Sequence, residues 1–459
     1  MDKKKGFAVW GVISLVFLLV KIAALRFKFS DGYTYMYMGK LILEGLVPYK
    51  DFFFASPPLQ AYIMALGLLV VGSKVILLKF IPILFTLGSG FFVYDFVRRK
   101  FGVAQGLVSS ILYLFSFLVL LTTDYSTGVH ISAFFVLGMV YFIELGKPVV
   151  SGIFGSLAML TRLYSPFAIA GVGLYVLIWK RKWFWKFILS CGGLFLIVSL
   201  FFEIISGNYV LNVFLFRMGL VKGIGLNKWN VFKFFFKGDF VLVLGSIGWL
   251  LFGKGKRKLL VPGLVSLFLI MFYAVYSDVY YLYFGLIVGC LAMFATRFIF
   301  LFRKLRCFKW GVVVFLILLT CWNVGFYFKN HVSSANIDFI DELVELVEEN
   351  SLESDTIYGS FDIVPLVGLL SGRRLAGNIA DTNPKNLMTG MVEVEDIVEK
   401  IRGVKFIITK ISLDSRGNTL GFGLSIPADF LKKECEVVKV YLVKKDYSDN
   451  AVVLWDCDN

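Results

Sequence analysis

The sequence predicts a polytopic α-helical membrane protein of about 11 transmembrane helices, followed by a soluble C-terminal α/β domain. Hydrophobic residues make up 58% of the 459 residues and charged residues only 17%, whereas soluble proteins carry about 25% charged residues. The 49 phenylalanines lie in apolar runs that are long enough to cross a bilayer. Residues 1–329 contain 34 basic and 10 acidic side chains, but residues 330–459 contain 13 and 22. We therefore expect a basic membrane domain in 1–329 and an acidic domain in 330–459.

The membrane domain begins with an apolar run at residues 7–25, which follows MDKKK. No small-residue cleavage site follows it, so we expect an uncleaved span rather than a signal peptide. The shorter run 59–72 favours an interfacial or re-entrant helix within an outer loop of residues 26–75 that contains juxtamembrane helices. The other expected spans are residues 76–96, 105–123, 128–146, 149–164, 166–180, 186–206, 239–253, 259–276, 280–298 and 309–327.

The basic clusters fall at alternate connections between these spans, as the positive-inside rule requires. They are Lys3–Lys5, residues 98–100, Lys147, residues 180–186, 254–258 and 303–306. This pattern predicts a multi-pass protein of the cell membrane, with a cytoplasmic N-terminus and an extracytoplasmic C-terminal domain. It also explains the net charge of +15 without nucleic acid, so we expect no nucleic-acid partner. Two long outer connections, 26–75 and 207–238, still carry basic residues, which favours an anionic ligand, although long loops escape the rule.

The C-terminal domain alternates helical and strand patterns. Residues 337–350 have apolar side chains at helical spacing. Residues 355–360, 404–410 and 436–445 read as strands, and the last of these forms a hairpin with AVVLWDC. Cys435 and Cys457 flank the hairpin and are able to pair in an oxidising compartment. With two histidines and no CxxC in the chain, we expect no required cofactor, although an acidic outer site remains compatible with a divalent metal.

Several polar residues stand out beside the apolar runs. Asp31 directly follows the first span and opens a helix that ends at Gly45. Either Ser30 or Asp31 caps this helix, or Asp31 faces a cleft as a general base, and the two roles are compatible. Downstream, Tyr49 and Asp51 lie in PYKDFFFASPP, which is either a rigid aromatic belt at the interface or the wall of an acceptor groove. Asp51 either orients this loop or contacts substrate.

The segment TTDYSTGVH places Asp124 and His130 at the second outer connection. Thr123 or Asp124 is a natural cap for the next helix. Asp124 is also one of the few acids on this side, so Asp31 and Asp124 together are candidates for a base and an acceptor-positioning group.

Basic and aromatic residues complete the candidate site. Arg162 lies in an apolar stretch, where it either reaches the interface or binds a phosphate. Arg217 and Lys222 lie in an amphipathic basic stretch, residues 208–239, which favours a membrane-surface helix and is also placed to meet a lipid phosphate. Asp278 lies beside tyrosines in SDVYYLY, which either form an interfacial belt or pack on a sugar.

Neither GxxxxGK[ST] nor GxGxxG after a strand occurs in the sequence. Chemistry on the outer face would have no access to nucleotide sugars, so an activated donor would have to be carried by a lipid.

The stretch SDGYTYMYMGKLILEGLVPYKDFFFASPPL, with the span before it, resembles the GT-C-type membrane glycosyltransferases. The nearest likeness is to the clan of the protein O-mannosyltransferases, which use dolichyl-phosphate mannose, and the lipid A aminoarabinose transferases. That clan has an acid after the first span, a helix with aromatics, a G-x-x-P-Y-x-D segment and a proline pair. The matching residues are Asp31, Gly45, Pro48, Tyr49, Asp51, Pro57 and Pro58.

Further residues extend the resemblance along the chain. Arg162 in SLAMLTRLYSP is similar to the clan's basic residue in a G-x-A-x-x-T-[KR] segment, and Asp124 to its acid before the fourth span. The tail resembles the soluble domains that these enzymes carry on the outer face. Many members have a second acid directly after the first, where this chain has Gly32. The departure leaves Asp31 as the base, aided by Asp124.

The resemblance implies a membrane glycosyltransferase that moves a hexose or pentose from a polyprenyl-phosphate or dolichyl-phosphate donor to an acceptor hydroxyl on a protein, lipid or glycan. Asp31 would be the catalytic base of an inverting displacement, and Arg162 with Arg217 or Lys222 would stabilise the leaving phosphate. Tyr49, Asp51, Asp124, His130 and Asp278 are the other expected substrate-binding residues. The alternative is a transporter or flippase of lipid-linked glycans, although the paired broken helices typical of transporters are not evident. A third reading is an assembly protein whose tail binds glycans.

Overall fold

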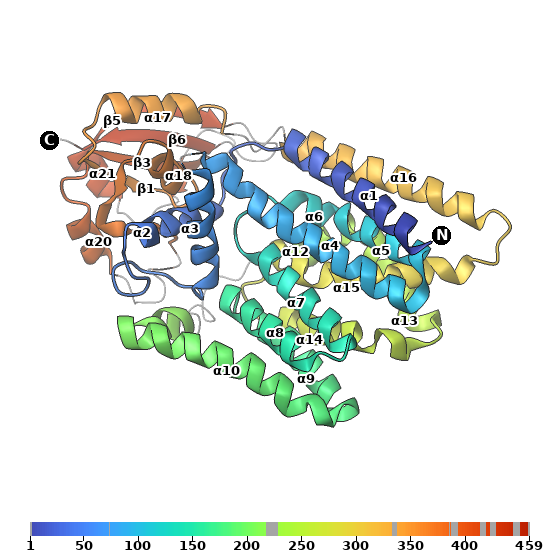
Figure 1. Ribbon diagram of the computed structural model, residues 1–459. Coiled ribbons are helices and arrows are strands. Elements are labelled where there is room, and N and C mark those ends of the chain that lie inside the picture. Colours follow the sequence, from blue (N-terminus) through green and yellow to red (C-terminus); the bar gives the residue numbers. More distant parts are fainter. Residues whose placement is uncertain are drawn as a thin grey trace.

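The computed structural model describes residues 2–72, 74–216, 228–332, 337–384, 386, 393–413, 419–422, 428–443 and 450–457. Its two regions are a helical body and a C-terminal domain at one end of it (Figure 1). The chain between the first span and the rest of the body lies at their junction, so the arrangement places residues 24–72 against both regions.

The body consists of helices that match the expected spans in position. Their bounds are α1 Lys3–Ala23, α4 Phe80–Phe101, α5 Val103–Leu114, α6 Phe117–Thr122, α7 Val129–Glu144, α8 Pro148–Thr161, α9 Ser165–Trp179, α10 Arg181–Ser206, α12 Lys228–Gly238, α13 Phe240–Phe252, α14 Leu260–Val275, α15 Gly285–Ile299 and α16 Phe308–Tyr327. Short helical turns connect them at Val75–Lys79, Leu211–Leu215, Lys256–Leu259, Tyr281–Phe284, Phe300–Phe302 and Phe328–Val332.

Six helices in the described residues are long and apolar enough to cross a membrane, or seven if the bent pair α12–α13 is one span. Five further apolar helices are shorter: α3 (Leu59–Val71), α5, α7, α8 and α9. The body is therefore that of a multi-pass membrane protein, and the number of 11 spans stays a prediction. α15 is central, because 72% of the apolar stretch that contains it, within residues 281–302, is buried. In α10 only 11% of the apolar stretch is buried, so this helix presents its apolar side chains outward.

The expected span 105–123 is broken into α5 and α6 at Phe115 and Ser116. Ser116 Oγ accepts a hydrogen bond from Val119 N at 3.3 Å and caps α6. The buried carboxylate of Asp239, between α12 and α13, accepts from Phe117 N and Leu118 N at 2.9 Å each. These side chains satisfy amide groups that a helix start leaves free, so the break is stabilised by contacts that apolarity alone does not reveal.

In its described residues, the C-terminal domain contains a six-stranded sheet with helices packed on it. The strand order is β2-β1-β3-β6-β5, with β4 paired to β3, and β1 is parallel to β2 and β3 while the other pairs are antiparallel. The strands are β1 Thr356–Gly359, β2 Arg374–Leu375, β3 Phe406–Leu413, β4 Thr419–Phe422, β5 Glu436–Val443 and β6 Asn450–Asp456. The helices are α17 Ile340–Glu349, α18 Val364–Leu370, α20 Val394–Lys400 and α21 Ala428–Glu434, with a short turn at Ala376–Asn378.

Most expected features of this domain are present. The helix in 337–350, the three strands and the final hairpin all form, and Cys435 is bonded to Cys457 across the hairpin ends. The apolar run in β3 is central and buried, because it lies between β1 and β6. β2 and β4 were not expected, since each is too short to show a periodic pattern.

Residues 26–75, which are expected to form an outer loop, contain α2, Gly32–Leu43, and α3, Leu59–Val71. α2 does not lie free on a membrane surface, since eight of its 12 residues are buried. Tyr37 Oη accepts a hydrogen bond from Leu375 N at 2.8 Å, which ties α2 to the C-terminal domain. On the other side, a Cβ at Gly39 would lie 2.8 Å from Ala65 N, so the glycine lets α2 approach α3 closely. α2 is therefore held between the two regions.

Candidate functional site

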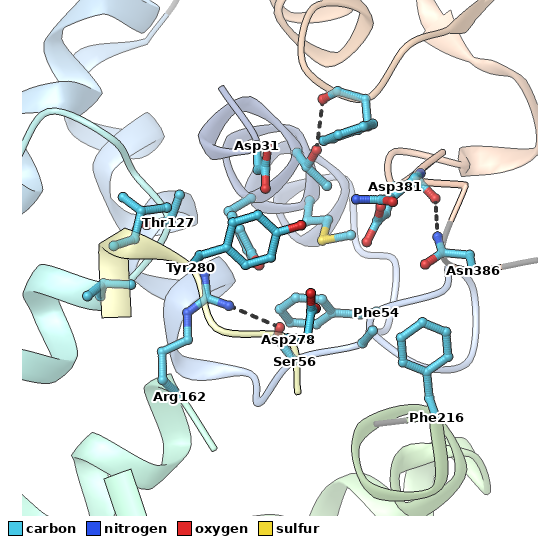
Figure 2. Close-up of a pocket in the computed structure, with 18 of the residues that line it drawn as sticks. Asp31, Phe54, Ser56, Thr127, Arg162, Phe216, Asp278, Tyr280, Asp381 and Asn386 are labelled. Atoms are coloured by element: carbon cyan, nitrogen blue, oxygen red, sulfur yellow. Dashed lines mark hydrogen bonds between the residues drawn. The ribbon is translucent and has the colours of Figure 1, made fainter. Parts of the chain in front are cut away.

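A pocket of about 230 Å³ lies where the helical body meets the C-terminal domain. The body supplies one end of α2, residues 54–56, the start of α7, the end of α8 and residues 278–283 to its wall. The C-terminal domain supplies Phe361, Asp381, Asn383 and Asn386. Figure 2 shows these groups converging from separate parts of the chain, with Asp31 and Asp381 above Arg162 in that view. The site is thus composite, and neither region forms it alone.

Asp31 directly precedes α2, at its N-cap position, but its carboxylate makes no capping hydrogen bond. Ser30 Oγ instead accepts from Gly32 N at 3.0 Å. The two roles that were open for Asp31 are thereby divided between neighbours: Ser30 satisfies the helix start, and Asp31 lines the pocket.

Close packing around position 32 explains why a glycine, and not a second acid, follows Asp31. A Cβ at this position would lie 2.9 Å from Ser126 N and 3.1 Å from Ser30 Oγ. Real Cβ atoms do not approach a backbone nitrogen so closely, so any side chain here would displace the 122–128 connection. The 122–128 connection therefore packs against Gly32 and occupies the space that the side chain of a second acid would need.

The surroundings of Asp31 raise the pKa of its carboxyl to about 6. Burial among protein atoms is the largest cause, followed by the negative charges of Asp381 and Asp362, while Arg162 acts in the opposite direction. Water nevertheless reaches the side chain, because it faces the open pocket. The arrangement is that of a carboxylate which is accessible to a substrate and more basic than an ordinary aspartate.

Arg162 ends α8 in an extended conformation and lies on another wall of the same pocket. Its side chain is buried, its Nη1 donates to Ser56 Oγ at 3.4 Å, and its guanidinium lies 4.8 Å from the centre of the Tyr35 ring. Nε–H has no hydrogen-bond partner in the part of the chain that the structure describes. Among the described residues no carboxylate lies within ion-pair distance of the guanidinium. A buried cation of this kind is suited to an anionic ligand.

Gly128 makes room for this arginine. It adopts a left-handed conformation with φ +81°, and a Cβ there would lie 2.8 Å from Gln60 Oε1 and 3.2 Å from Arg162 Nε. Gln60 Nε2 in turn donates to Ser126 O at 2.7 Å. The connection before α7 is therefore shaped around the guanidinium.

Tyr49 and Asp51 shape the pocket from behind rather than lining it. Tyr49 Oη donates to Ser56 O at 2.8 Å, and its ring stacks on Phe54 with centroids 5.6 Å apart. Asp51 Oδ2 accepts from Val47 N at 2.7 Å, which is the loop-orienting role considered for it. Both residues fix the segment that carries Phe54, Ala55 and Ser56 into the pocket wall.

Asp124 and His130 lie outside the pocket, contrary to the expected acid pair with Asp31. Asp124 is buried, and its carboxylate forms ion pairs with Lys21 at 2.6 Å and Lys28 at 3.4 Å. His130 Nε2 lies 2.6 Å from Thr122 Oγ1 in the protein interior. A carboxylate whose oxygens are occupied by two lysines and hidden from solvent cannot contact an acceptor, so Asp124 is a structural tie between the first span and the α6–α7 connection.

Of the three remaining candidate residues, the structure describes only Asp278. Asp278 does line the pocket, together with Tyr280 and Tyr283 from the same connection. Arg217 and Lys222 lie outside the described residues. No group of three side chains suited to hold a metal ion occurs among the residues that the structure describes.

The pocket residues of the C-terminal domain were not among the site residues predicted from the sequence. Phe361 follows β1, and the Asp381 segment comes after β2 and a short turn. Because β1 and β2 are parallel, their carboxyl ends meet at one edge of the sheet, which is where α/β domains commonly bind ligands. The polar run DTNP at 381–384 after an apolar segment was a usable signal, since Asp and Asn are typical of such loops.

Comparisons with known proteins agree with this architecture. Residues 55–205 match the family model described as dolichyl-phosphate-mannose-protein mannosyltransferase, a range that includes Ser56 and Arg162 but begins after Asp31. No curated protein sequence matches the chain.

Solved structures cover nearly the whole chain. ArnT from Cupriavidus metallidurans, bound to undecaprenyl phosphate, has a TM-score of 0.69 at 12% identity, with 98% of each chain covered. The archaeal oligosaccharyltransferase AglB from Archaeoglobus fulgidus has a TM-score of 0.55 at 12% identity, over 93% of this chain and 75% of AglB. The arabinofuranosyltransferase AftD from Mycobacteria has a TM-score of 0.54 at 12% identity, over 98% of this chain and 40% of AftD. By its family-model match and by its fold, the chain resembles the GT-C-type membrane glycosyltransferases, as the residues around Asp31 indicated.

Proposed function

We propose that this protein is a glycosyltransferase that moves a sugar from a polyprenyl-phosphate donor to an acceptor hydroxyl, with Asp31 as the base. The observation that carries the proposal is that an accessible carboxylate and a buried arginine, which has no acidic partner among the described residues, line one pocket between the membrane body and the C-terminal domain. The fold shared with ArnT, a protein that binds undecaprenyl phosphate, supports a lipid-phosphate donor.

Asp31 suits the base because it is free of the capping role and faces the pocket. General-base assistance contributes roughly 10²–10⁴-fold to rate, and it is most effective when the pKa of the base is near the working pH. The raised pKa of Asp31, about 6, brings its carboxyl close to that condition while leaving it mostly ionised at neutral pH.

Arg162 suits the donor phosphate because the Nε–H of its guanidinium has no partner among the described residues and the group lies beside Tyr35 and Ser56. A guanidinium binds phosphate through two parallel N–H···O bonds. Both its charge and its hydrogen bonds would stabilise the negative charge that grows on the phosphate as the sugar leaves.

The proposed reaction is a single inverting displacement. The acceptor oxygen forms a bond to the anomeric carbon as the bond between that carbon and the phosphate oxygen breaks. The acceptor proton passes to the Asp31 carboxylate, and the bonding electron pair leaves with the phosphate beside Arg162. Polyprenyl phosphate is a stable anion, so its departure requires no general acid. The sugar is a hexose or a pentose, and the acceptor is a protein, lipid or glycan.

The proposed orientation has the N-terminus in the cytoplasm and the pocket with the C-terminal domain on the outer face. The alternation of basic clusters supports it, and so does the Cys435–Cys457 disulfide, since disulfides persist in oxidising compartments.

Mass analysis of cell-envelope glycans tests the function directly. Cells that lack the protein should lose one sugar mass, which the wild type restores and Asp31→Asn does not. Membrane vesicles from the same cells then receive that sugar in tritiated form on undecaprenyl phosphate, and transfer is counted. An Asp31→Asn protein that restores the sugar fully would overturn the base assignment, and an unchanged set of glycans in the deletion would overturn the transferase.

A further inference from the structure

We infer that Asp381, in the C-terminal domain, is an active-site carboxylate that acts on the proton transfer through Asp31, as a positioning residue. This inference rests on the proposed function and deepens it, because it gives the C-terminal domain a direct part in the chemistry. Asp381 and Asp31 lie more than 300 residues apart in the sequence and line the same pocket. Figure 2 shows Asp31 on the α2 side of that pocket and Asp381 on the side of the C-terminal domain.

The Asp381 segment is fixed in place by hydrogen bonds within the C-terminal domain. Thr382 Oγ1 donates to Gly359 O at 2.6 Å, at the end of β1. Asn386 Nδ2 donates to Asp381 O at 2.7 Å, and Asn383 N donates to Asp381 Oδ1 at 3.2 Å. These bonds close the loop on itself and hold the direction of the Asp381 side chain.

A second set of hydrogen bonds fixes this loop relative to Asp31. Thr34 Oγ1, one turn into α2, contacts Phe361 O at 3.1 Å and Ala380 O at 3.4 Å. Ser30 N donates to Asp362 O at 3.2 Å. Ser30 and Thr34, on either side of Asp31, are therefore bonded to the segments that carry Asp362 and Asp381, and these hydrogen bonds hold the Asp381 segment against the start of α2.

Several charged and titratable groups face Asp31 from the elements packed around it. Asp362 follows β1 and forms an ion pair with Lys410 of β3 at 2.5 Å, which offsets its charge. Arg162 approaches from the end of α8, and Asp278, Tyr280 and Tyr281 from the connection before α15. Among these groups Asp381 raises the pKa of the Asp31 carboxyl most, and Arg162 opposes it.

The consequence is a division of labour between the two regions. The membrane body supplies the proton-accepting carboxylate and the phosphate-binding arginine. The C-terminal domain supplies a like charge that makes Asp31 a stronger base, since two nearby carboxylates disfavour each other's ionised forms. Without Asp381 the same Asp31 would be a weaker base, and the proton of the acceptor hydroxyl would be accepted less readily.

The test is the pH dependence of kcat/KM in membrane vesicles, with the sugar found by glycan analysis supplied on undecaprenyl phosphate. In Asp381→Asn the acid limb should move to lower pH by roughly half a unit or more, as expected for one charge removed from a partly buried site. Asparagine keeps the oxygen that accepts from Asn383 N. Asp381→Glu keeps the charge and should keep the limb near its wild-type position.

Two further variants keep the result interpretable. Asp396→Asn makes the same chemical change at an exposed position on α20 and should move nothing. Asp381→Ser removes the charge by another side chain and should reproduce the shift if Asp381→Asn proves unstable. An acid limb that stays at the wild-type pH in both charge-removing variants would overturn the inference while leaving the proposed function intact. Full activity of Asp31→Asn would instead overturn the base assignment on which this inference rests, and an unchanged set of glycans in the deletion would overturn the transferase itself.

Discussion

Two aspartates near the C-terminal end of the first span differ in what surrounds them. Asp31 lines a pocket, and the guanidinium of Arg162 lies on another wall of the same pocket. Asp124 is buried against Lys21 and Lys28, and Lys21 Nζ is further bonded to Leu120 O at 2.7 Å and Tyr327 Oη at 2.9 Å. The comparison teaches that a carboxylate is available for chemistry where solvent and substrate reach its oxygens. It is structural where it is buried and each of its two oxygens pairs with a buried lysine.

The matched pair of Asp→Asn substitutions gives the sharpest test of this contrast, and the larger effect on activity belongs to Asp31→Asn. We expect transfer to fall by roughly 10²–10⁴-fold, the contribution of a general base. Folding should be unharmed. Since the pKa of Asp31 is raised in the folded state, its stabilising contribution is present below about pH 4 and is lost as pH rises through about 6. At pH 7.5 the variant should therefore melt no lower than the wild type, as measured by thermal unfolding in detergent; a lower melting temperature would mean that Asp31 is structural.

Asp124→Asn should show the reverse result. It leaves Lys21 and Lys28 buried without their counter-charge, and breaking a buried ion pair costs about 3–5 kcal/mol. We expect a lower yield of folded protein and a clearly lower melting temperature. A double variant with Lys21→Met should recover part of the loss, because coupled residues are not additive. Normal stability combined with lost activity would place Asp124 in the reaction after all.

Arg162→Ala should weaken binding of undecaprenyl phosphate by roughly 10–100-fold, the range expected for loss of charge-assisted hydrogen bonds. Calorimetry of the purified protein with undecaprenyl phosphate measures the affinity. Arg374→Ala is the control, because this arginine is exposed and pairs with Glu44 at the surface. Equal affinities for wild type and Arg162→Ala would remove Arg162 from the phosphate site.

The smallest expected effect is the pH response of the wild type. Asp31 must be ionised to accept a proton, so kcat/KM should fall about tenfold per unit as pH drops below about 6, and should be level above it. A profile that stays level down to pH 4.5 would show that the Asp31 carboxyl is an ordinary, fully solvated one or that it takes no proton.

Much of the fold was predictable because its signals are local. Apolar length, basic clusters and alternating strand patterns depend on neighbouring residues, and they correctly gave the helical body and the α/β tail. The sequence left open whether Cys435 and Cys457 pair, and the structure contains that disulfide. The break at Ser116 was not predictable, since it depends on Asp239 from a distant connection. β2 pairs only 2 of its residues with β1, too few to leave a pattern in the sequence.

The candidate site was predictable in part. Asp31, Arg162 and Asp278 were named from their position beside apolar runs, and the structure brings all three to one pocket. Asp124 has the same local appearance as Asp31, and only the spatial course of α1 shows that Lys21 reaches it. Asp381 was missed because its relation to Asp31 arises from the contact between α2 and the C-terminal domain.

The sequence by itself therefore determined a membrane body, an α/β tail and the chemical types that occupy the outer connections. The tertiary structure decided which of these side chains share a pocket and which neutralise one another. The physical reason is that hydropathy and periodicity are properties of adjacent residues, whereas desolvation and charge pairing depend on distances between residues far apart in the chain. Ser30 accepts the hydrogen bond at the start of α2, and Lys21 forms an ion pair with Asp124. The C-terminal domain places Asp381 in the same pocket as Asp31.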